Sequence, residues 1–256
     1  MTKLIVGLST LFLLLGCGGP NVDRSDSLVV IDAGHGGHDC GASCENKKEK
    51  DLVLQITKKL KREFKSEGYR VYLTRNRDRF LTLGQRTRIA DRKDAKVFIS
   101  LHANAISDKS RFDEVEGVET YFLQKTRDEK SQRIAARENA SVLKGTDKLS
   151  QDVIIDAVLN GPKIIESQKL AIDVQQHMIK NLNGDYDDVK DGGVRPAPFY
   201  VLVGASRPSI LVEVGYITNP KERERLFTSN YQEEIVEGIV EGVNRYLDNR
   251  KKEIGF

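Results

Sequence analysis

Two histidines and two glutamates occupy positions where the strands and helices of a predicted α/β sheet meet. His35 and His102 each follow a short apolar run that we expect to be a buried strand. Glu49 begins the first predicted helix, and Glu213 lies near the end of a late strand. Because the ends of parallel strands and the starts of the following helices lie on one edge of a sheet, we expect these side chains to converge there.

This set of residue types suits a catalytic metal centre. Two imidazoles and one carboxylate are a standard ligand set for catalytic Zn²⁺, and they leave a fourth position for water. Zinc lowers the pKa of that water to about 7, so hydroxide becomes available near neutral pH. A second carboxylate beside the metal can take the proton and pass it to a leaving amine. The pattern therefore predicts metal-assisted amide hydrolysis.

Each of these residues also has a simpler structural explanation. Glu213 lies in an otherwise apolar run, where a carboxylate usually pairs with an arginine, and Arg207 is a candidate partner. Its place at the active edge of the sheet favours a catalytic role. At the start of a helix, Glu49 would be favoured by the helix dipole alone. We assign His38 to a loop and His177 to a surface helix, outside the chemistry.

The overall composition is that of an ordinary globular domain. The chain has 256 residues, of which 31% are charged and 39% are hydrophobic, enough for one domain with a substantial core. The net charge of +3 is too small for this length to indicate nucleic-acid binding. We therefore expect a single domain with no nucleic-acid partner.

The first 17 residues resemble a bacterial lipoprotein signal peptide. The apolar run 4–15 is too short to span a bilayer, which takes about 20 residues. Cys17 follows Leu14-Leu15-Gly16 as in a lipobox, so we expect it to be lipidated; the alternative is an ordinary signal peptide with a chance cysteine. Residues 18–27 then form a flexible tether. Because Gly18 and not aspartate follows the cysteine, we expect a periplasmic protein anchored to the outer membrane, in a cell with two membranes.

Two further cysteines, Cys40 and Cys44, lie four residues apart in the predicted loop after the first strand. In an oxidising compartment they can form a small disulfide. Two free thiols, or thiolates that bind a second metal together with His38, are the alternatives. The sequence leaves these open, because bridging depends on geometry.

Strands and helices alternate along the rest of the chain. The predicted strands are 28–31, 69–74, 96–101, 117–123, 199–203 and 209–215, and the predicted helices are 49–65, 82–94, 129–143, 165–182, a short one after Asn219-Pro220, and 231–249. This order predicts an α/β fold over residues 28–250: a single three-layer domain with a mostly parallel twisted sheet flanked by helices. The segment 125–162 is longer than a usual crossover, so we interpret it as a helical insertion. We interpret residues 183–193 as a Gly-Asp-rich turn. Thr82-Leu-Gly-Gln85 is a capping-box pattern that begins the second predicted helix.

Four blocks of this sequence resemble the signature blocks of the zinc-dependent N-acetylmuramoyl-L-alanine amidases of bacterial cell-wall turnover, the Amidase_3 family. The blocks are Ile31-Asp-Ala-Gly-His-Gly-Gly-His-Asp39, Glu49-Lys-Asp-Leu52, Ser100-Leu-His-Ala-Asn104 and Val212-Glu-Val-Gly-Tyr-Ile-Thr-Asn-Pro220. The match runs from about Leu28 to Leu247, in family order and spacing.

The resemblance implies a role for each residue of the predicted centre. It implies that His35, Glu49 and His102 bind one Zn²⁺ and that Glu213 is the catalytic glutamate, which agrees with the roles expected from the chemistry. The implied substrate is peptidoglycan, cleaved between N-acetylmuramic acid and L-alanine of the stem peptide. Cys40 stands where the family commonly has proline, so we expect this loop to be stiffened differently.

The insertion resembles the segment of the cell-division amidases in which a helix covers the zinc site until an activator protein displaces it. The resemblance implies autoinhibition, with a carboxylate such as Glu138, Asp152 or Asp156 near the metal, and a role in daughter-cell separation. The alternative is a purely structural insertion.

Two other functions are weighed against this one. The same ligand set would serve a zinc peptidase or deacylase acting on another wall substrate. A catalytically inactive peptidoglycan-binding lipoprotein is the alternative from a different class. All four catalytic positions are filled, which disfavours the inactive protein.

Overall fold

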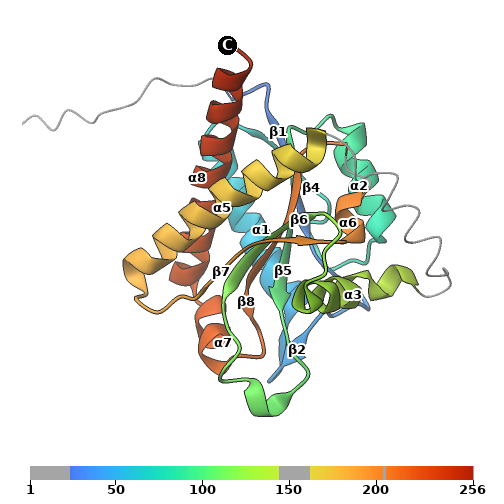
Figure 1. Ribbon diagram of the computed structural model, residues 1–256, viewed down its shortest axis with the longest axis vertical. Coiled ribbons are helices and arrows are strands. Elements are labelled where there is room, and N and C mark those ends of the chain that lie inside the picture. Colours follow the sequence, from blue (N-terminus) through green and yellow to red (C-terminus); the bar gives the residue numbers. More distant parts are fainter. Residues whose placement is uncertain (1–23, 144–161, 204–205, 256) are drawn as a thin grey trace, which may run out of the picture.

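The structure, a computed structural model, describes residues 24–143, 162–203 and 206–255 (Figure 1). The main sheet consists of β1 (Leu28–Ala33), β4 (Arg70–Leu73), β5 (Val97–Asn104), β6 (Val118–Leu123), β7 (Asp191–Ala197) and β8 (Ser209–Tyr216). The helices are α1 (Glu49–Ser66), α2 (Leu83–Arg92), α3 (Glu129–Leu143), α5 (Pro162–Asp185), α6 (Tyr200–Val203), α7 (Pro220–Leu226) and α8 (Ser229–Glu253). A small hairpin, β2 (Ser43–Cys44) and β3 (Lys47–Lys48), and a 3-10 turn, η1 (Lys109–Arg111), complete the fold.

The strand order in the main sheet is β4-β1-β5-β8-β6-β7. The first four strands are parallel to one another. β6 runs antiparallel to β8, and β7 runs parallel to β6. The prediction of a mostly parallel sheet is confirmed, with β6 and β7 as the two reversed strands. His102 on β5 pairs in register with Glu213 on β8, so two of the predicted site residues lie side by side.

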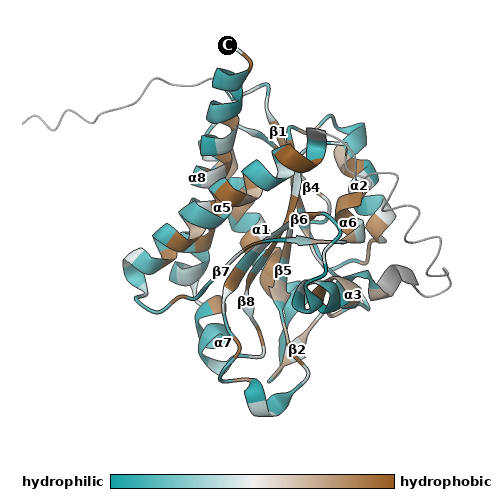
Figure 2. Cartoon of the chain, in the orientation of Figure 1, coloured by the Kyte–Doolittle hydropathy of each residue, from teal (hydrophilic) through white to brown (hydrophobic). Residues whose placement is uncertain are grey.

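Helices cover both faces of the sheet, which confirms the predicted three layers (Figure 1). α1, α5 and α8 pack on one face against alternate strand residues such as Val29 and Ile31. α2, α3 and α6 pack on the other face, against residues such as Val30 and Phe98. Figure 2 shows hydrophobic residues on the strands and hydrophilic residues on the outer helix faces. This alternation is what a sheet buried on both sides requires.

One predicted strand is wrong. In place of the predicted strand 199–203, Tyr200–Val203 form the short helix α6. The side-chain oxygen of Asn139 on α3 accepts a hydrogen bond from the backbone N–H of Tyr200 at 2.8 Å, which satisfies an unpaired donor at the helix start. The apolar residues of this segment are buried against α2 and β6, as they would be in a strand, so hydrophobicity alone did not distinguish the two.

The missing strand lies in a segment that we interpreted as a Gly-Asp-rich turn. β7 begins within the predicted turn 183–193 and pairs with β6. A Cβ atom on Gly192 would lie 2.2 Å from Cγ of Glu119, so glycine is needed for β7 to approach β6 this closely. Glycine disfavours a strand by its intrinsic propensity, yet β7 requires a glycine at position 192.

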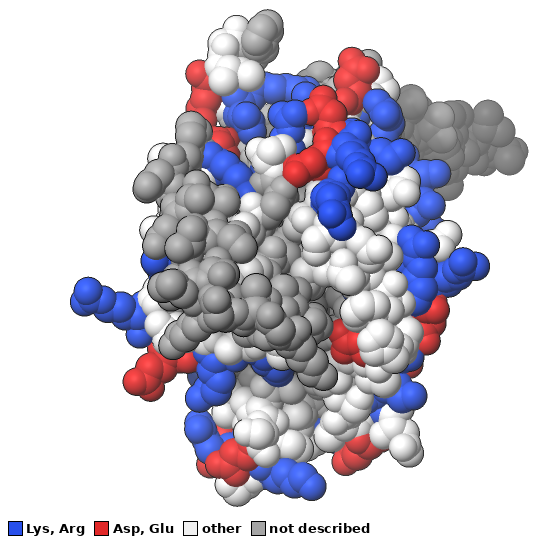
Figure 3. All heavy atoms as spheres, turned by 90° about the vertical axis from the view of Figure 1, so that its right-hand side faces the viewer, with Lys and Arg blue, Asp and Glu red and all other residues white. Residues whose placement is uncertain are grey.

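Several sequence predictions lie outside the described residues. These are the signal peptide, Cys17 and the first part of the tether, and also Asp152 and Asp156 of the insertion. Within the insertion, α3 confirms the predicted helix 129–143. None of the described helices is both long and apolar enough to cross a membrane. On the face shown in Figure 3, basic and acidic side chains are interspersed from top to bottom, in keeping with the small net charge.

The crossing of α5 and α8 gives a test of the packing. Cβ atoms on Gly238 and Gly242 would lie 2.4 Å from the backbone Cα atoms of Met178 and Val174. We expect Gly242→Ala to lower the free energy of unfolding by about 1–3 kcal/mol, because the helices must separate. Gly184→Ala is the matched control, since nothing lies within 4 Å of that site. Equal midpoints of urea unfolding for the two variants would contradict this crossing.

Candidate metal centre

Four ligand atoms from four separate segments meet at the carboxyl end of the parallel strands. His35 Nε2 lies 3.0 Å from Glu49 Oε1 and 3.2 Å from Glu138 Oε2. His102 Nδ1 lies 3.1 Å from Glu49 Oε1 and 3.0 Å from Glu138 Oε2. All four residues offer ligand atoms within 4.8 Å of one another. The structure thus brings together the three predicted ligands and adds a fourth carboxylate from α3.

The spacing of these atoms fits a tetrahedral metal ion. Ligands bound to zinc at 2.0–2.1 Å in a tetrahedron lie about 3.3 Å apart, close to the separations found here. His35 Nε2 and Glu138 Oε2 are buried and have no hydrogen-bond partner among the described residues. Each of these two imidazole nitrogens also faces two carboxylate oxygens, and a single N–H can donate a well-aligned hydrogen bond to only one of them. The set of two nitrogen and two oxygen donors therefore suits a divalent cation.

A strained loop after β1 positions His35. This residue has a φ of 57°, in the left-handed region that non-glycine residues rarely adopt. Asp39 Oδ2 lies 3.0 Å from His35 Nδ1, which fixes the ring and directs Nε2 to the centre. The preceding residue, Gly34, faces the other histidine, and a Cβ there would lie 2.5 Å from Cε1 of His102. The predicted Gly-rich loop therefore lets two imidazoles approach one metal.

Two buried arginines hold this loop from behind. Arg75 Nη2 donates to the carbonyl of Gly34 at 2.7 Å, and Arg86 Nη2 donates to the carbonyl of His35 at 2.7 Å. Arg86 is itself held by Asp32 on β1, at 2.8 Å. These charge-assisted bonds secure the strained backbone. Sequence reasoning did not identify either arginine, because nothing in a single sequence distinguishes a buried arginine from a surface one.

Glu49 is fully buried at the first residue of α1. Its Oε2 accepts a hydrogen bond from the backbone N–H of Ala42 at 2.8 Å, and its Oε1 accepts one from Ala103 at 3.0 Å. Burial raises the pKa of this carboxyl, but the neighbouring His35 and His102 outweigh burial and hold the pKa well below its usual range. Glu49 is therefore an ionised, oriented carboxylate that could bind a metal, and its place is not explained by the helix dipole alone.

Glu138 is the carboxylate of the insertion that reaches the centre. We named it as one of three candidates, and the structure confirms that it lies there; Asp152 and Asp156 are outside the described residues. Its second oxygen, Oε1, accepts a hydrogen bond from Arg137 Nε at 2.7 Å. α3 thus places an arginine and a glutamate, adjacent in the sequence, against the site.

Glu213 lies beside His102, and neither of its carboxylate oxygens has a hydrogen-bond partner among the described residues. Arg137 Nη2 lies 3.6 Å from its Oε1. Burial, together with the negative charges of Glu138 and Glu49, raises the pKa of Glu213 to about 8 against the opposing effect of Arg137. A buried carboxyl of raised pKa beside a metal site is the environment of a general base or acid.

The predicted structural partner of Glu213 is wrong. Arg207 pairs with Asp94 on the loop between α2 and β5. Glu213 instead faces Arg137 of α3. Arg207 is close to Glu213 in the sequence but not in the fold, because Arg207 precedes β8 and lies at the opposite end of that strand from Glu213.

The remaining candidates lie outside the group of four. The ring of His38 stacks at 4.2 Å on Phe80 in the loop, and Nδ1 of His177 lies 2.8 Å from a carbonyl oxygen within α5. Cys40 and Cys44 are free thiols in the structure, with no disulfide between them. This corresponds to the second of the alternatives given above.

We expect the chain to bind one equivalent of Zn²⁺ through this group. Loss of an outer hydrogen bond to a ligand costs 10–100-fold in metal affinity, so His102→Ala, which removes a ligand, is expected to cost at least about 100-fold. His177→Ala is the matched control. Competition with a chelator measures the affinities, and circular dichroism checks the fold. Equal affinities in folded His102→Ala and His177→Ala proteins would show that the metal binds elsewhere.

Comparison with known proteins agrees with the geometry. The family described as Amidase_3, N-acetylmuramoyl-L-alanine amidase, matches residues 29–245. The N-acetylmuramoyl-L-alanine amidase AmiC of Escherichia coli O6:H1 is 33% identical, over 86% of this chain and 52% of its own length, so this chain spans about half of it. AmiA of Escherichia coli K12 is 31% identical, over 88% of this chain and 78% of its own.

A solved structure gives the same fold. The N-acetylmuramoyl-L-alanine amidase from Clostridium difficile 630 superposes with a TM-score of 0.67 and 29% identity, covering 88% of this chain and 98% of that chain. With a family match over most of its length, this chain belongs to the N-acetylmuramoyl-L-alanine amidase family and is a peptidoglycan amidase.

Proposed function

We propose that this amidase is zinc-dependent and hydrolyses the bond between the lactyl group of N-acetylmuramic acid and L-alanine of the stem peptide. The observation that carries the proposal is the convergence of two imidazole nitrogens and two carboxylate oxygens at 3.0–3.2 Å. Glu213 stands beside this group on the neighbouring strand. We assign His35, Glu49 and His102 as the zinc ligands and Glu213 as the catalytic glutamate.

The protein side chains divide the work of amide hydrolysis between them. When bound, zinc supplies a water of lowered pKa and polarises the scissile carbonyl. Glu213 takes a proton from the attacking water and returns it to the departing amino group of L-alanine. Its two oxygens are free of hydrogen bonds from the described residues, so neither must be released before the proton moves. Asp39, through His35, keeps a ligand in its productive orientation.

We further propose that α3 holds the enzyme inactive. Three residues of the group suffice as a catalytic ligand set, and the fourth position belongs to water. Glu138 Oε2 lies within 3.2 Å of both imidazoles, so it would take that fourth position when zinc is bound. An anionic ligand there excludes the water that the reaction consumes. Burial raises the pKa of Glu138, but His102 and Arg137 outweigh it and hold the pKa well below its usual range, so the blocking carboxylate stays charged.

Arg137 adds a second block on the same helix. Its guanidinium lies between Glu138 and Glu213 and is bound by the side chain of Asn104 and the carbonyl of Ala105. A cation at 3.6 Å from Glu213 lowers the proton affinity of the carboxylate that must act as the base. Displacement of α3 removes both blocks in one movement.

The attachment of α3 is suited to release by a partner protein. Its described buried apolar residues are few, Ile134 and Ala135, and the rest of the contact is polar, such as Asn139 to the carbonyl of Pro198. Lys130 of α3 also pairs with Glu119 on β6. We propose that an activator displaces α3 during cell-wall remodelling and daughter-cell separation. We also propose that Cys17 is lipidated and holds the enzyme at a periplasmic membrane surface, in the outer membrane.

The test compares release of stem peptides from purified peptidoglycan, at saturating zinc, by mass spectrometry. We expect Glu138→Ala to raise the basal rate by roughly tenfold or more, in the range of known coupling energies. Addition of Glu213→Gln to that variant abolishes the release of peptides that begin with L-alanine, because the general base is lost. Arg133→Ala, an exposed change on α3, is the matched control and leaves the rate low.

Two results would contradict the proposal in different ways. If a folded, zinc-loaded Glu138→Ala protein had the wild-type rate, the hypothesis of autoinhibition through this carboxylate would be wrong. The proposed amidase chemistry would be unaffected by that result. Peptides with a different N-terminus would instead show that the enzyme cuts another bond.

A further inference from the structure

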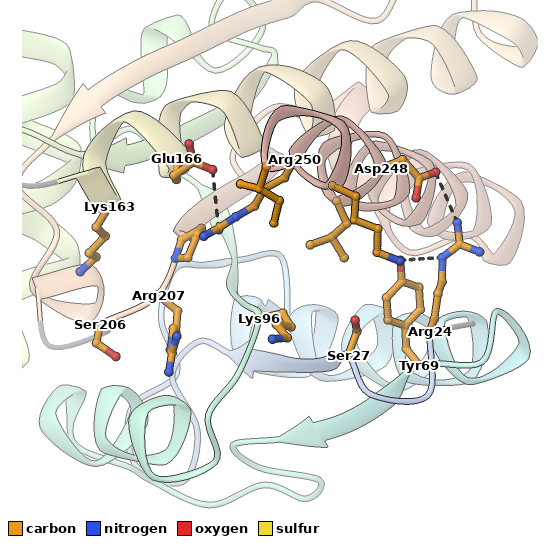
Figure 4. Close-up of a pocket in the computed structure, with 14 residues that line it drawn as sticks. Arg24, Ser27, Tyr69, Lys96, Lys163, Glu166, Ser206, Arg207, Asp248 and Arg250 are labelled. Atoms are coloured by element: carbon orange, nitrogen blue, oxygen red, sulfur yellow. Dashed lines mark hydrogen bonds and ion pairs between the residues drawn. The ribbon is translucent and has the colours of Figure 1, made fainter. Parts of the chain in front are cut away.

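A cavity of about 800 Å³ lies at the other end of the sheet from the metal centre (Figure 4). Ser27, Lys96 and Pro208 line it, and they immediately precede β1, β5 and β8. The first turns of α5 and the last turns of α8 form the opposite wall. The cavity therefore lies where the parallel strands begin, whereas the metal centre lies where they end.

The length of the strands separates the two sites. β1 has six residues and β5 has eight, and a strand advances about 3.3 Å per residue. The cavity is consequently about 20–25 Å from the metal centre. This distance excludes contact between a ligand in the cavity and the bond that is cut, so the cavity serves another purpose.

The lining of the cavity is strongly basic. Glu166 and Asp248 are its acidic residues, and each is already paired, with Arg250 at 3.6 Å and with Arg24 at 3.7 Å (Figure 4). The basic residues of the lining are Arg24, Lys96, Lys163, Arg207, Arg250 and Lys251. Arg207 also pairs with Asp94, which lies outside the lining.

The three lysines of the lining, Lys96, Lys163 and Lys251, form no ion pair within 4.0 Å among the described residues. Lys163 donates to the backbone carbonyl of Leu202 at 2.9 Å, and burial lowers its pKa to about 8. Uncompensated cations around a cavity attract an anion that brings several acceptor oxygens. A phosphate group meets this requirement.

The cavity is also apolar in part. Pro208 and Leu247 line it, and Ile254, at the end of α8, is 61% exposed at its margin. A ligand that combines phosphate with a hydrocarbon portion contacts both kinds of surface. Free inorganic phosphate uses only one of them.

The proposed lipidation of Cys17 would bring this cavity close to a membrane. Arg24 lines it and follows the predicted lipidated residue, Cys17, by seven residues (24 − 17). A fully extended chain of that length spans at most about 25 Å. A lipid on Cys17 would hold the cavity within that distance of the bilayer. A lipid anchor attached to the edge of the sheet that carries the metal centre would hold the cavity much further away.

We infer that this cavity binds the phosphate headgroup of an anionic phospholipid in the membrane to which the chain is tethered. The orientation that follows rests on the proposed lipidation of Cys17, although the binding itself does not. With the cavity against the bilayer, the metal centre lies on the far edge of the sheet and faces the peptidoglycan. The headgroup contact would thus fix the orientation of the protein on the bilayer.

The test uses residues 21–256, which lack the anchor, and sedimentation with phosphatidylcholine vesicles with or without phosphatidylglycerol. We expect binding only to vesicles with phosphatidylglycerol. In the double variant Lys96→Gln and Lys163→Gln this binding falls by roughly tenfold or more, since each lysine near an anionic surface contributes about 1 kcal/mol. Replacement of the same two residues by arginine keeps the charge and restores binding.

The matched control removes two exposed lysines elsewhere, Lys58→Gln and Lys180→Gln, the second on the distal part of α5. It is expected to bind vesicles nearly as the wild type does. Equal losses in the pocket variant and the control would attribute binding to overall charge and overturn the inference. Equal binding to vesicles with and without phosphatidylglycerol would overturn it too. So would a result in which inorganic phosphate protects Lys163 from an acylating reagent while the protein binds no vesicles, because the ligand would then be soluble phosphate.

Amidase activity of the same variants is measured in the Glu138→Ala background. Lys96 and Lys163 lie at the far edge of the sheet, so we expect their replacement to leave that rate unchanged. Normal hydrolysis of peptidoglycan by a protein with unaltered pocket lysines that shows no preference for anionic vesicles would overturn this inference alone and leave the proposed function standing.

Discussion

Three glutamates, Glu49, Glu138 and Glu213, are buried together at the carboxyl end of the parallel strands. Removing that much negative charge from water is costly unless cations balance it. Without a metal, the carboxylates act on the histidines: burial lowers the pKa of His102, but Glu138 and Glu49 outweigh it and raise the pKa to about 9. A divalent cation among the four side chains would balance the same charge with neutral imidazoles. The glycine loop, the buried arginines behind it and the start of α1 position His35 and Glu49 of this group.

The same balance of charge links regulation to catalysis. α3 contributes one anion, Glu138, and one cation, Arg137, to the site, so its departure would change the net charge of the site little. In the proposed activation, water would replace Glu138, and Glu213 would lose its contact with Arg137. The described contacts of α3 include polar ones, such as Asn139 at both Pro198 and Tyr200, which a competing protein surface would replace. In the proposed regulation, inhibition and its release would therefore both reside in α3.

Much of this arrangement can be predicted from the sequence, because apolar runs mark β1, β5 and β8 and polar residues follow them. The capping box from Thr82 to Gln85 was also correctly located at the start of α2. The reversed direction of β6 and the strand β7 were not predictable, since hydrophobic pattern carries no strand direction and Gly192 argues against a strand. Contacts between segments far apart in the sequence could not be predicted either. The sequence identifies Arg137 only as a residue of a predicted helix, and its contact with Glu213 depends on tertiary packing.

The central claim is that a carboxylate of α3 occupies the fourth ligand position of a zinc ion. A crystal structure of the zinc-loaded chain tests it most directly. The account predicts one tetrahedral ion bound by His35 Nε2, His102 Nδ1, Glu49 and Glu138, with oxygen ligands at about 2.0–2.2 Å. An ion bound by the two histidines and Glu49 alone, with water in the fourth position and Glu138 turned away, would contradict it.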